Sequence, residues 1–407
     1  MTASKPRTGL AAIPRGVWML GFVSLFMDLS SELIHALLPL YLAVGLGASM
    51  ATIGIIEGIA EATALIVKVF SGVISDWFRR RKPLAVLGYG LAAVTKLVFP
   101  LAPTLGWVVA ARLADRVGKG IRGAPRDALI ADLTPPAVRG ASFGLRQALD
   151  TVGGIGGPLL AIGAIAVFAG DFRAAFWVAV VPAFIAVALL VLGVEEPKHA
   201  GTGPAADDAK RKRLSLADAK RLGRDFWIVV GIAALLTLAR FSEAFLVLRA
   251  QSIGWSIGAA PWVMVLMSIV YAATSYPAGA AADRGRGPVL LSAGLAALIA
   301  SDLALAHAAG GTLLCAGVAL WGLHMGLTQG LLAALVAGTA PADLRGTAFG
   351  VFNLVCGVAL LVASALAGWL WDAFGPRVTF YAGAAFTALA WLALARHGMR
   401  AAKMPAA

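Results

Sequence analysis

Long apolar segments recur along the whole chain, and they restrict its fold more than any other feature. Segments of mostly apolar residues, each long enough to cross a membrane, follow one another with short polar loops between them. A helix of roughly 20 apolar residues spans the hydrocarbon core and satisfies its own backbone hydrogen bonds there. Apolar residues make up 60% and charged residues 14% of the chain, which lies outside the range of water-soluble domains. The sequence therefore predicts an all-α membrane protein.

About twelve spans fit the chain, in two groups of six. They are placed at residues 17–44, 51–75, 83–102, 105–125, 141–168 and 174–194, and at 225–248, 258–281, 287–308, 312–338, 346–371 and 377–396. The one long polar segment, at 195–224, separates the groups and has the composition of a cytoplasmic linker. We therefore expect an N-terminal six-helix bundle at 1–194, this linker, and a C-terminal six-helix bundle at 225–407.

Basic residues mark one side of the membrane. They lie at the N-terminus, at Arg79–Lys82, at Lys210–Arg213, at Arg284 and Arg286, at Arg345 and in the C-terminal tail, whereas the alternate loops hold little beyond Arg173, Arg249 and Arg377. The positive-inside rule therefore places both termini in the cytoplasm and the protein in the inner membrane. The first apolar stretch is too long for a cleavable signal peptide and is expected to stay in the membrane. The net charge of +13 is distributed over separate loops, so no continuous basic face for nucleic acid is expected.

Two short patterns, each with a glycine and a charged residue, occur once in each half of the chain. They are Gly72 to Asp76 with Gly279 to Asp283, offset by 207 residues, and Arg139-Gly140 with Arg345-Gly346, displaced by 206 residues. Because both copies fall between corresponding spans at nearly one offset, we infer duplication of a six-helix unit.

The Gly-x-x-x-Asp pattern with its basic loop resembles the signature of the major facilitator superfamily. The first copy comprises Gly72, Asp76, Arg79 and Arg80, and the weaker second copy comprises Gly279, Asp283, Arg284 and Arg286. The resemblance covers the whole chain, since the number of spans and the long central loop agree with it. It implies a fold of two pseudo-symmetric six-helix bundles and transport by alternating access.

Two further patterns are similar to motifs of this family. Asp115 and Arg116 belong to a segment that resembles its motif in the fourth span, although Arg116 stands where the family has a small residue. Gly153, Gly157 and Pro158 are similar to a glycine-rich motif of exporters of the antiporter type. The resemblance therefore implies proton-coupled export of a small organic compound.

Each pattern has a physical use. Glycine at positions 72 and 279 lets neighbouring helices approach closely, and the aspartates can pair with the basic loop residues, so that the two copies would latch the cytoplasmic face. A topology signal is the alternative for the basic residues alone. Gly153, Gly157 and Pro158 would thin and bend their span against the opposite bundle, and tight static packing is the alternative.

Ionisable residues inside spans are costly, so each needs a partner or a function. Asp28, Glu32 and His35 lie four and three residues apart, on one face of the first span. A carboxylate near mid-membrane binds protons more readily than one in water, so Asp28 and Glu32 are candidates for proton coupling. Pairing with arginines is the alternative. Glu57 and Glu61 in the second span are further candidates.

Several of these charges have candidate partners. Lys96 lies at a depth similar to that of Glu57, which favours an ion pair between them. Arg146 and Asp150 are one helical turn apart and should pair. Arg112 is the deepest arginine of the fourth span and keeps its charge, so it can bind an anion or alter the proton affinity of a nearby carboxylate.

The C-terminal half carries fewer charges inside its spans. The candidates for substrate binding are Arg240, Glu243, Trp321, His324, Gln329 and Asn353 from this half, together with His35 and Arg112 from the first. Packing is the alternative for the uncharged members of 312–338. The asymmetry favours proton handling in the first half and a more apolar substrate wall in the second.

The solute itself stays open. Basic residues of the fourth span favour an anionic metabolite, and acidic residues of the first favour a metal or metalloid species, so both are alternatives to a small organic compound. A receptor that transports nothing is less favoured. No motif of a hydrolase, zinc protease or phosphate loop is complete, and Cys315 and Cys356 lie inside spans without metal-ligand spacing, so no enzyme, cofactor or metal site is expected. We expect a monomer whose partners are its substrate, protons and the lipid bilayer.

Overall fold

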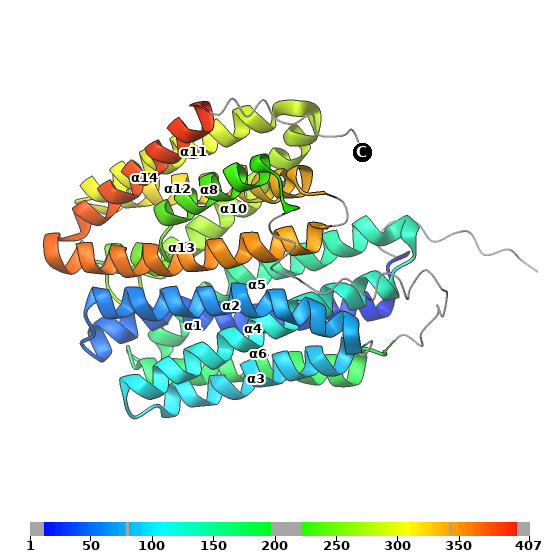
Figure 1. Ribbon diagram of the computed structural model, residues 1–407. Coiled ribbons are helices and arrows are strands. Elements are labelled where there is room, and N and C mark those ends of the chain that lie inside the picture. The colour runs from blue at the N-terminus through cyan, green and yellow to red at the C-terminus, as the bar shows by residue number, and fades with distance from the viewer. Residues whose placement is uncertain (1–11, 79–80, 197–220, 342–343, 397–407) are drawn as a thin grey trace, which may run out of the picture. The chain divides into compact units, whose positions relative to one another are not determined.

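The computed structural model describes residues 12–78, 81–196, 221–341 and 344–396, which form helices without any β-strand (Figure 1). The long helices are α1 (Arg15–Leu40), α2 (Met50–Phe78), α3 (Arg81–Leu101), α4 (Leu105–Leu133), α5 (Arg139–Val167), α6 (Phe172–Gly193), α8 (Arg224–Ala239), α9 (Ala244–Ser252), α10 (Trp262–Ala281), α11 (Gly287–His307), α12 (Gly311–Thr339), α13 (Arg345–Phe374) and α14 (Pro376–Arg396). Short segments are η2 (Tyr41–Gly45), η3 (Pro136–Val138) and η5 (Ala282–Arg286). Every expected span is present, so the all-α class is confirmed, and the seventh span differs in form.

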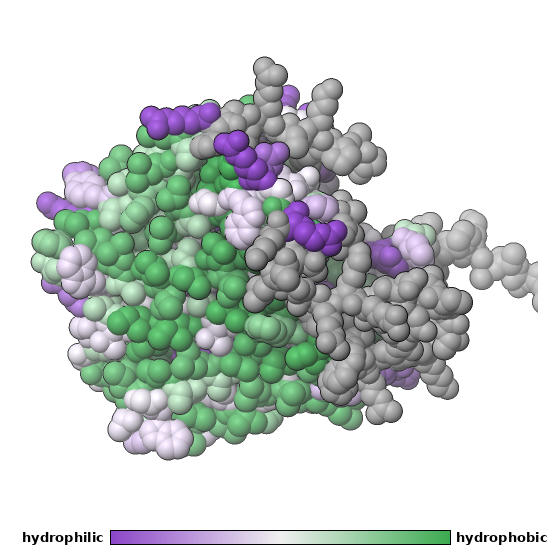
Figure 2. Space-filling model, viewed as in Figure 1, coloured by the Kyte–Doolittle hydropathy of each residue, from purple (hydrophilic) through white to green (hydrophobic). Residues whose placement is uncertain are grey.

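The surface of the described helices is suited to lipid. Among the described residues, nine helical stretches are long and apolar enough to cross a membrane, and one of them, Trp262–His307, joins α10 and α11 through η5. Large apolar side chains point outward, such as Val167 and Leu192, which are 77% and 85% exposed. The face in Figure 2 is mostly hydrophobic, with hydrophilic residues gathered at its margins. A surface of this kind requires hydrocarbon rather than water around it.

The seventh span is two helices, so our prediction of one continuous helix is wrong. α8 ends at Ala239 and α9 begins at Ala244. Ser242 accounts for the interruption, because its N–H donates to Ser364 Oγ at 3.1 Å and its own Oγ accepts from the N–H of Ala244 at 3.3 Å. Serine side chains compete with the helical backbone in this way. The break leaves Arg240–Glu243 in non-helical backbone in the middle of the span.

α4 continues about two turns beyond its expected end at residue 125. The added residues are held from two sides. Leu129 and Ile130 are fully buried, and Asp132 Oδ2 lies 2.6 Å from Arg81 Nη1 at the start of α3. The extension carries charged residues, including Arg126, and brings them beside α1 and α5.

The chain forms two compact units. Unit 1 comprises the described parts of Met1–Ile34, Val67–Leu160 and Arg173–Arg213, and unit 2 comprises those of His35–Ile66, Ala161–Phe172 and Leu214–Ala407. α1, α2 and α5 therefore contribute to both units. Most of the expected linker, residues 197–220, lies outside the described residues. The bundle boundaries at 194 and 225 stay predictions.

In unit 1, α3 and α4 pack closely because each has a glycine at the contact. A Cβ atom on Gly88 would lie 2.9 Å from Gly118 O, and one on Gly118 would lie 2.7 Å from Gly88 O. Glycine permits this approach where a side chain would not. Tyr89 and Ala92 of α3 are fully buried beside the contact, in a core to which α1, α4 and α6 also contribute. This packing fixes α4, which carries eight aspartate, lysine and arginine residues.

In unit 2, α12 occupies a central place. It packs against α10 and α11, and also contacts α8, α9 and α13. α14 packs against α8, α11 and α13. Trp321 and His324 of α12 are each 1% exposed, which follows from this position.

Arg249 and Arg173, which depart from the positive-inside pattern, donate hydrogen bonds to the ends of helices. Arg249 Nε donates to Leu305 O at 2.9 Å and its Nη2 donates to Ala308 O at 2.7 Å, at the carboxyl end of α11. Arg173 Nη2 donates to Ala102 O at 2.7 Å, at the carboxyl end of α3. The last carbonyl groups of a helix lack intrahelical donors. These arginines therefore have structural uses and do not argue against the expected orientation.

Candidate functional site

The glycines of α5 lie against the acidic residues of α1. A Cβ atom on Gly153 would lie 2.9 Å from Asp28 Cβ, and one on Gly157 would lie 2.5 Å from Glu32 Cβ. Nothing lies within 4 Å of the same position on Gly154. Two glycines four residues apart thus match two carboxylates four residues apart, which is one helical turn on each helix. The glycine motif and the acidic pair form one site in unit 1.

Our prediction that this motif faces the opposite bundle is wrong for Gly153 and Gly157, whose close neighbours are on α1. The reason is steric. The Cβ positions of these glycines lie 2.8 Å from Leu25 O and 2.9 Å from Leu33 N, so the two backbones approach through the missing side chains. Pro158 lies inside α5, which continues past it to Val167.

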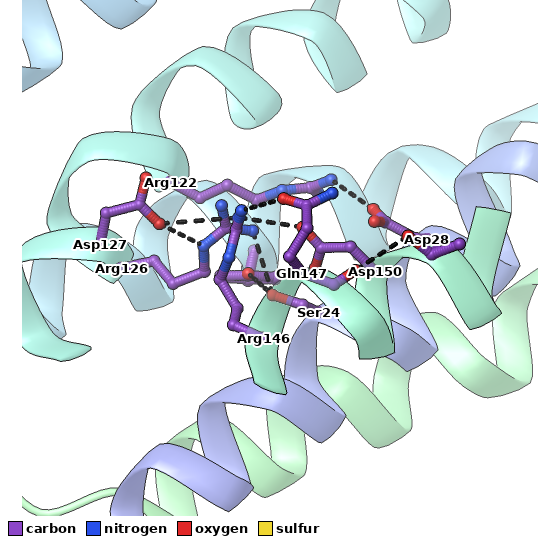
Figure 3. A network of polar contacts seen from close by, with 10 residues as sticks. Ser24, Asp28, Arg122, Arg126, Asp127, Arg146, Gln147 and Asp150 are labelled. Atoms are coloured by element: carbon purple, nitrogen blue, oxygen red, sulfur yellow. Dashed lines mark hydrogen bonds and ion pairs between the residues drawn. The ribbon is translucent and has the colours of Figure 1, made fainter. Parts of the chain in front are cut away.

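Asp28 lies at one end of a network of arginines and aspartates (Figure 3). Its members on α1, α4 and α5 are Ser24, Asp28, Arg122, Arg126, Asp127, Arg146, Gln147 and Asp150. Arg146 Nη1 lies 2.9 Å from Asp150 Oδ2, which confirms the pair expected from their spacing. Arg126 Nε lies 3.1 Å from Asp127 Oδ1, and its Nη1 donates to Ser24 Oγ at 3.0 Å. Most charges of the network therefore have a close partner.

Asp28 has looser pairing than Asp150. Its Oδ1 lies 3.7 Å from Arg122 Nη2, and its side chain is 26% exposed. Arg122 also lies over the ring of Tyr89, with 4.9 Å between the guanidinium carbon and the ring centroid. A weakly held and partly exposed carboxylate can exchange a proton with less disturbance than a closely paired one. Glu32 and Asp150 lie within electrostatic range of Asp28, so their charges also bear on its protonation.

Lys96 pairs with Asp115, so our predicted ion pair between Lys96 and Glu57 is wrong. Lys96 Nζ donates to Asp115 Oδ1 at 2.8 Å, and the two side chains are 0% and 2% exposed. The close packing of α3 on α4 brings them together. Removing one partner of such a buried pair costs about 3–5 kcal/mol, so Asp115 of the fourth-span motif has a structural role. Arg112 and Arg116 on the same helix are also buried.

The other acidic candidates are distributed over both units. Glu57 is fully buried in unit 2, where its Oε2 lies 3.9 Å from His35 Nε2. Glu61 is partly buried in the same unit. Glu32 is partly buried in unit 1, one turn from Asp28. The structure therefore brings Asp28 and Glu32 together beside α5, and His35 together with Glu57.

In unit 2, four candidates for substrate binding gather around the break in the seventh span. Arg240 and Glu243 lie in the break, and the ring centroid of Phe241, which follows Arg240, is 5.6 Å from that of Trp321. His324, one turn from Trp321 on α12, lies within electrostatic range of Arg240. Its Nδ1 donates to Gly294 O at 2.8 Å. The break between α8 and α9, together with α12, therefore supplies one polar and aromatic cluster.

Several further residues bear on this cluster. Glu243, Tyr271 and Cys356 lie within electrostatic range of Arg240. No sequence pattern singles out Tyr271. The sequence indicates only a packing role for Cys356, because it does not reveal the helix break. Gln329 and Asn353, the remaining candidates, are partly buried on α12 and α13.

The first copy of the predicted latch falls mostly outside the described residues. The structure does not describe the surroundings of Gly72, the side chain of Asp76, or Arg79 and Arg80. In the second copy, nothing lies within 4 Å of the Cβ position of Gly279, so the close helix approach expected there is wrong. Asp283, Arg284 and Arg286 are exposed in η5. The latch stays a prediction.

α13 is bonded to the amino end of α2 in unit 2. Asp372 Oδ1 accepts from the N–H of Met50 at 3.0 Å, and Asp372 Oδ2 accepts from the N–H of Ala51 at 2.8 Å. Ser49 Oγ accepts from the N–H of Thr52 at 3.2 Å. The first N–H groups of a helix lack intrahelical acceptors, and negative charge is favourable beside them. A residue 322 positions away therefore caps α2.

Glycines at further positions along α2 and α13 also lie in the contact between the two helices. Gly54 lies against Ser364 O, and Gly368 lies against Met50 O. A Cβ atom on Gly58 would lie 3.0 Å from the backbone of α13. These positions leave no room for side chains, so the two helices are in close contact along this stretch.

Metal-binding groups are not apparent in the part of the chain that the structure describes. No cluster of three or more His, Cys, Asp or Glu side chains is placed there to hold an ion. Cys315 and Cys356 are free thiols, on α12 and α13 respectively.

Known sequences match the chain over almost its whole length. A family model described as Major Facilitator Superfamily matches residues 20–248 and 241–404. An uncharacterized MFS-type transporter of Methanocaldococcus jannaschii is 33% identical over 389 residues, which are 94% of each chain. The multidrug resistance protein MdtL of Escherichia coli O157:H7 is 24% identical over 337 residues, which are 81% of each chain.

A solved structure shows the same fold. The crystal structure of a peptide transporter POT in complex with sulfate superimposes with a TM-score of 0.80, covering 96% of each chain at 15% identity. At this identity the likeness concerns the arrangement of the helices and not the solute.

Proposed function

The chain belongs to the major facilitator superfamily, a family of transporters that are in general not enzymes, and from this premise we propose that it exports a small organic compound in exchange for protons. The contact of Gly153 and Gly157 with Asp28 and Glu32 is the observation that carries the proposal. The motif that resembles one of antiporter-type exporters thus lies directly on the candidate proton-binding residues. Similarity to a multidrug resistance protein is further support for export.

Asp28 is the proposed point of coupling. With its carboxylate charged, Asp28 attracts Arg122 of α4 across 3.7 Å. Protonation of the Asp28 carboxylate removes that attraction. Because Asp28 is on α1 and the other charged members of the network are on α4 and α5, the proton alters how strongly these helices are held together. A proton that binds one conformation better than the other shifts the population between them, and substrate binding is coupled to the proton through the same equilibrium.

We also propose the location and the moving parts. The protein acts as a monomer in the inner membrane with both termini in the cytoplasm, as the basic loops favour. Residues 1–194 and 225–407 form the two bundles that move during alternating access. The basic loops with Asp76 and Asp283 latch the cytoplasmic face, and the contact of Asp372 with α2 closes the opposite face.

Flux into proteoliposomes with an imposed pH gradient tests this function. A panel of small organic compounds is offered outside vesicles whose lumen is acidic. Antiport predicts that a transported compound accumulates inside above its outside concentration while protons leave, and that a protonophore abolishes the accumulation. Transport that proceeds equally with and without the gradient would contradict proton coupling. Protein-free vesicles give the background.

Replacing Asp372 by alanine is expected to favour the conformation in which α2 and α13 have separated. A helix cap contributes about 0.5–2 kcal/mol, so the ratio of closed to open molecules should fall by roughly 5–30-fold if the contribution is one to two kcal/mol. The distance between spin labels at Val44→Cys and Phe374→Cys reports it, because both positions are exposed. The two native cysteines are first replaced by alanine.

Ser49→Ala is the matched control for this experiment. Ser49 caps the same end of α2 through Thr52 but does not join it to α13. Its removal should leave the distance distribution near that of the unsubstituted protein. Equal distributions for the Asp372→Ala and Ser49→Ala proteins would mean that Asp372 is only a helix cap.

A further inference from the structure

We infer that the break in the seventh span binds the anionic group of the transported compound, and that the substrates are organic acids with an apolar ring or chain. The inference rests on the proposed function and adds the substrate class to it. It depends on hydrogen-bonding groups without a described partner, in the break between α8 and α9 and on α12.

Arg240 is a cation held in the interior of unit 2. Its Nε is buried without a hydrogen-bond partner among the described residues. Glu243 is the acidic group within its electrostatic range. A guanidinium keeps its charge and has five N–H donors in a planar fork. Its Nε can therefore donate to an oxygen of a ligand carboxylate even with one acidic group in its range.

Further unused donors lie beside Arg240. The backbone N–H of Phe241 has no acceptor among the described residues, because the helix is interrupted there. Trp321 Nε1 is buried, also without a described partner. Non-helical backbone at membrane depth is tolerated where it lines a site for water or ligand. An anion is the ligand that satisfies donors from all three groups.

The two helix ends at the break differ in the sign of the helix dipole that they present. At the carboxyl end of α8, the N–H of Arg240 donates to Leu236 O and Thr237 O, at 3.2 and 3.1 Å. At the other side, α9 begins and presents the positive end of its dipole toward the break. Discontinuous membrane helices use such amino ends to hold anionic groups. The break is therefore better suited to an anion than to a cation.

The apolar part of the ligand has aromatic neighbours. The ring centroid of Phe241 lies 5.6 Å from that of Trp321 and 5.5 Å from that of Phe245. His324 donates from Nδ1 to Gly294 O, so Nε2 of its neutral ring is an acceptor. That atom is buried without a described partner and would accept from a hydroxyl group of the ligand. The recognised compound is thus an organic anion with an apolar body.

Binding of three probes with one ring system tests the inference. The probes are 2-naphthoate, 2-naphthamide and 2-naphthylmethylamine, which are anionic, neutral and cationic at pH 7. Each is titrated against the purified protein in detergent, and the rise in unfolding temperature is measured. We expect 2-naphthoate to stabilise the protein and the other two to do so at least about 10-fold more weakly, since neither offers the guanidinium a charged hydrogen-bond partner. Equal binding of the amide, or tighter binding of the amine, overturns the inference.

Variants locate the binding. Arg240→Gln should weaken 2-naphthoate binding by about 10-fold or more, and Arg240→Lys should restore part of it. Trp321→Phe retains an aromatic ring, although a smaller one, and loses the N–H, so it should weaken binding by about 2–10-fold and also serves if Arg240 variants do not fold. Arg377→Gln is the matched control, because Arg377 is exposed. Wild-type affinity in both Arg240→Gln and Trp321→Phe would exclude this site.

The experiment separates this inference from the proposed function. It measures binding in detergent without a pH gradient. If the anion binds selectively at Arg240 but flux is independent of the pH gradient, the substrate class is retained and proton coupling is rejected. If the gradient drives flux of neutral or cationic compounds only, proton coupling is retained and the substrate class is rejected.

Discussion

Asp28→Asn is expected to abolish proton-driven accumulation of substrate while leaving exchange of substrate for substrate. Asparagine has nearly the shape of aspartate and can still accept from Arg122, but it cannot bind or release a proton at that oxygen. Inside-acidic proteoliposomes should therefore take up substrate only to the level reached without a gradient. Exchange between labelled and unlabelled substrate needs no net proton movement and should continue, which shows that the variant is folded.

The same experiment with Glu32→Gln asks whether the second carboxylate of α1 shares the role. Asp225→Asn is the control, because Asp225 is an exposed residue in the first turn of α8. It should accumulate substrate as the unsubstituted protein does. Full accumulation by the Asp28→Asn protein would remove Asp28 from the coupling mechanism and leave its contact with Arg122 as structural.

The spans could be predicted from the sequence because membrane crossing depends on local composition. The break in the seventh span could not. It depends on a hydrogen bond from Ser242 to Ser364, which lies 122 residues further along the chain. Without that partner, 225–248 reads as one apolar helix. The cap that Asp372 forms on α2 was missed for the same reason, since nothing near Met50 or Asp372 in the sequence marks the pair.

Ion pairs within one helix could be predicted from the sequence, whereas ion pairs between helices could not. Arg146 and Asp150 were paired correctly because a spacing of four places them on one face of one helix. Lys96 was assigned to Glu57 from depth alone, and depth does not say which helices adjoin. The contact of Gly88 with Gly118 decides the matter by placing α3 on α4, where Asp115 lies.

The network around Asp28 was predictable in part. The acidic pair of α1 and the glycines of α5 are both visible as patterns, and each was a candidate. Their contact was not visible, since the spacing of Gly153 and Gly157 indicates a close neighbour without identifying it. Ser24 and Gln147 carry no sequence signal, and they enter the site because two arginines donate to them.

Gly157→Ala is expected to destabilise the protein by about 1–3 kcal/mol and to remove most transport. The added methyl group would stand 2.5 Å from Glu32 Cβ and 2.9 Å from Leu33 N. Because both neighbours belong to the α1 chain near its backbone, no flexible side chain can turn aside, and α1 must shift from α5. The unfolding temperature in detergent and the flux into proteoliposomes measure the two effects.

Gly154→Ala is expected to leave stability and transport intact if the effect of Gly157→Ala comes from its contact with α1 and not from the loss of a glycine. Nothing lies within 4 Å of the Cβ position of Gly154, and alanine is favoured over glycine in a helix by up to about 1 kcal/mol. This variant should therefore be as stable as the unsubstituted protein or more so, with its flux retained. Gly153→Ala should follow Gly157→Ala, because its neighbours are Leu25 O and Asp28 Cβ. If all three variants behaved alike, the glycines of α5 would matter for helix flexibility, and their contact with the acidic pair would no longer explain the motif.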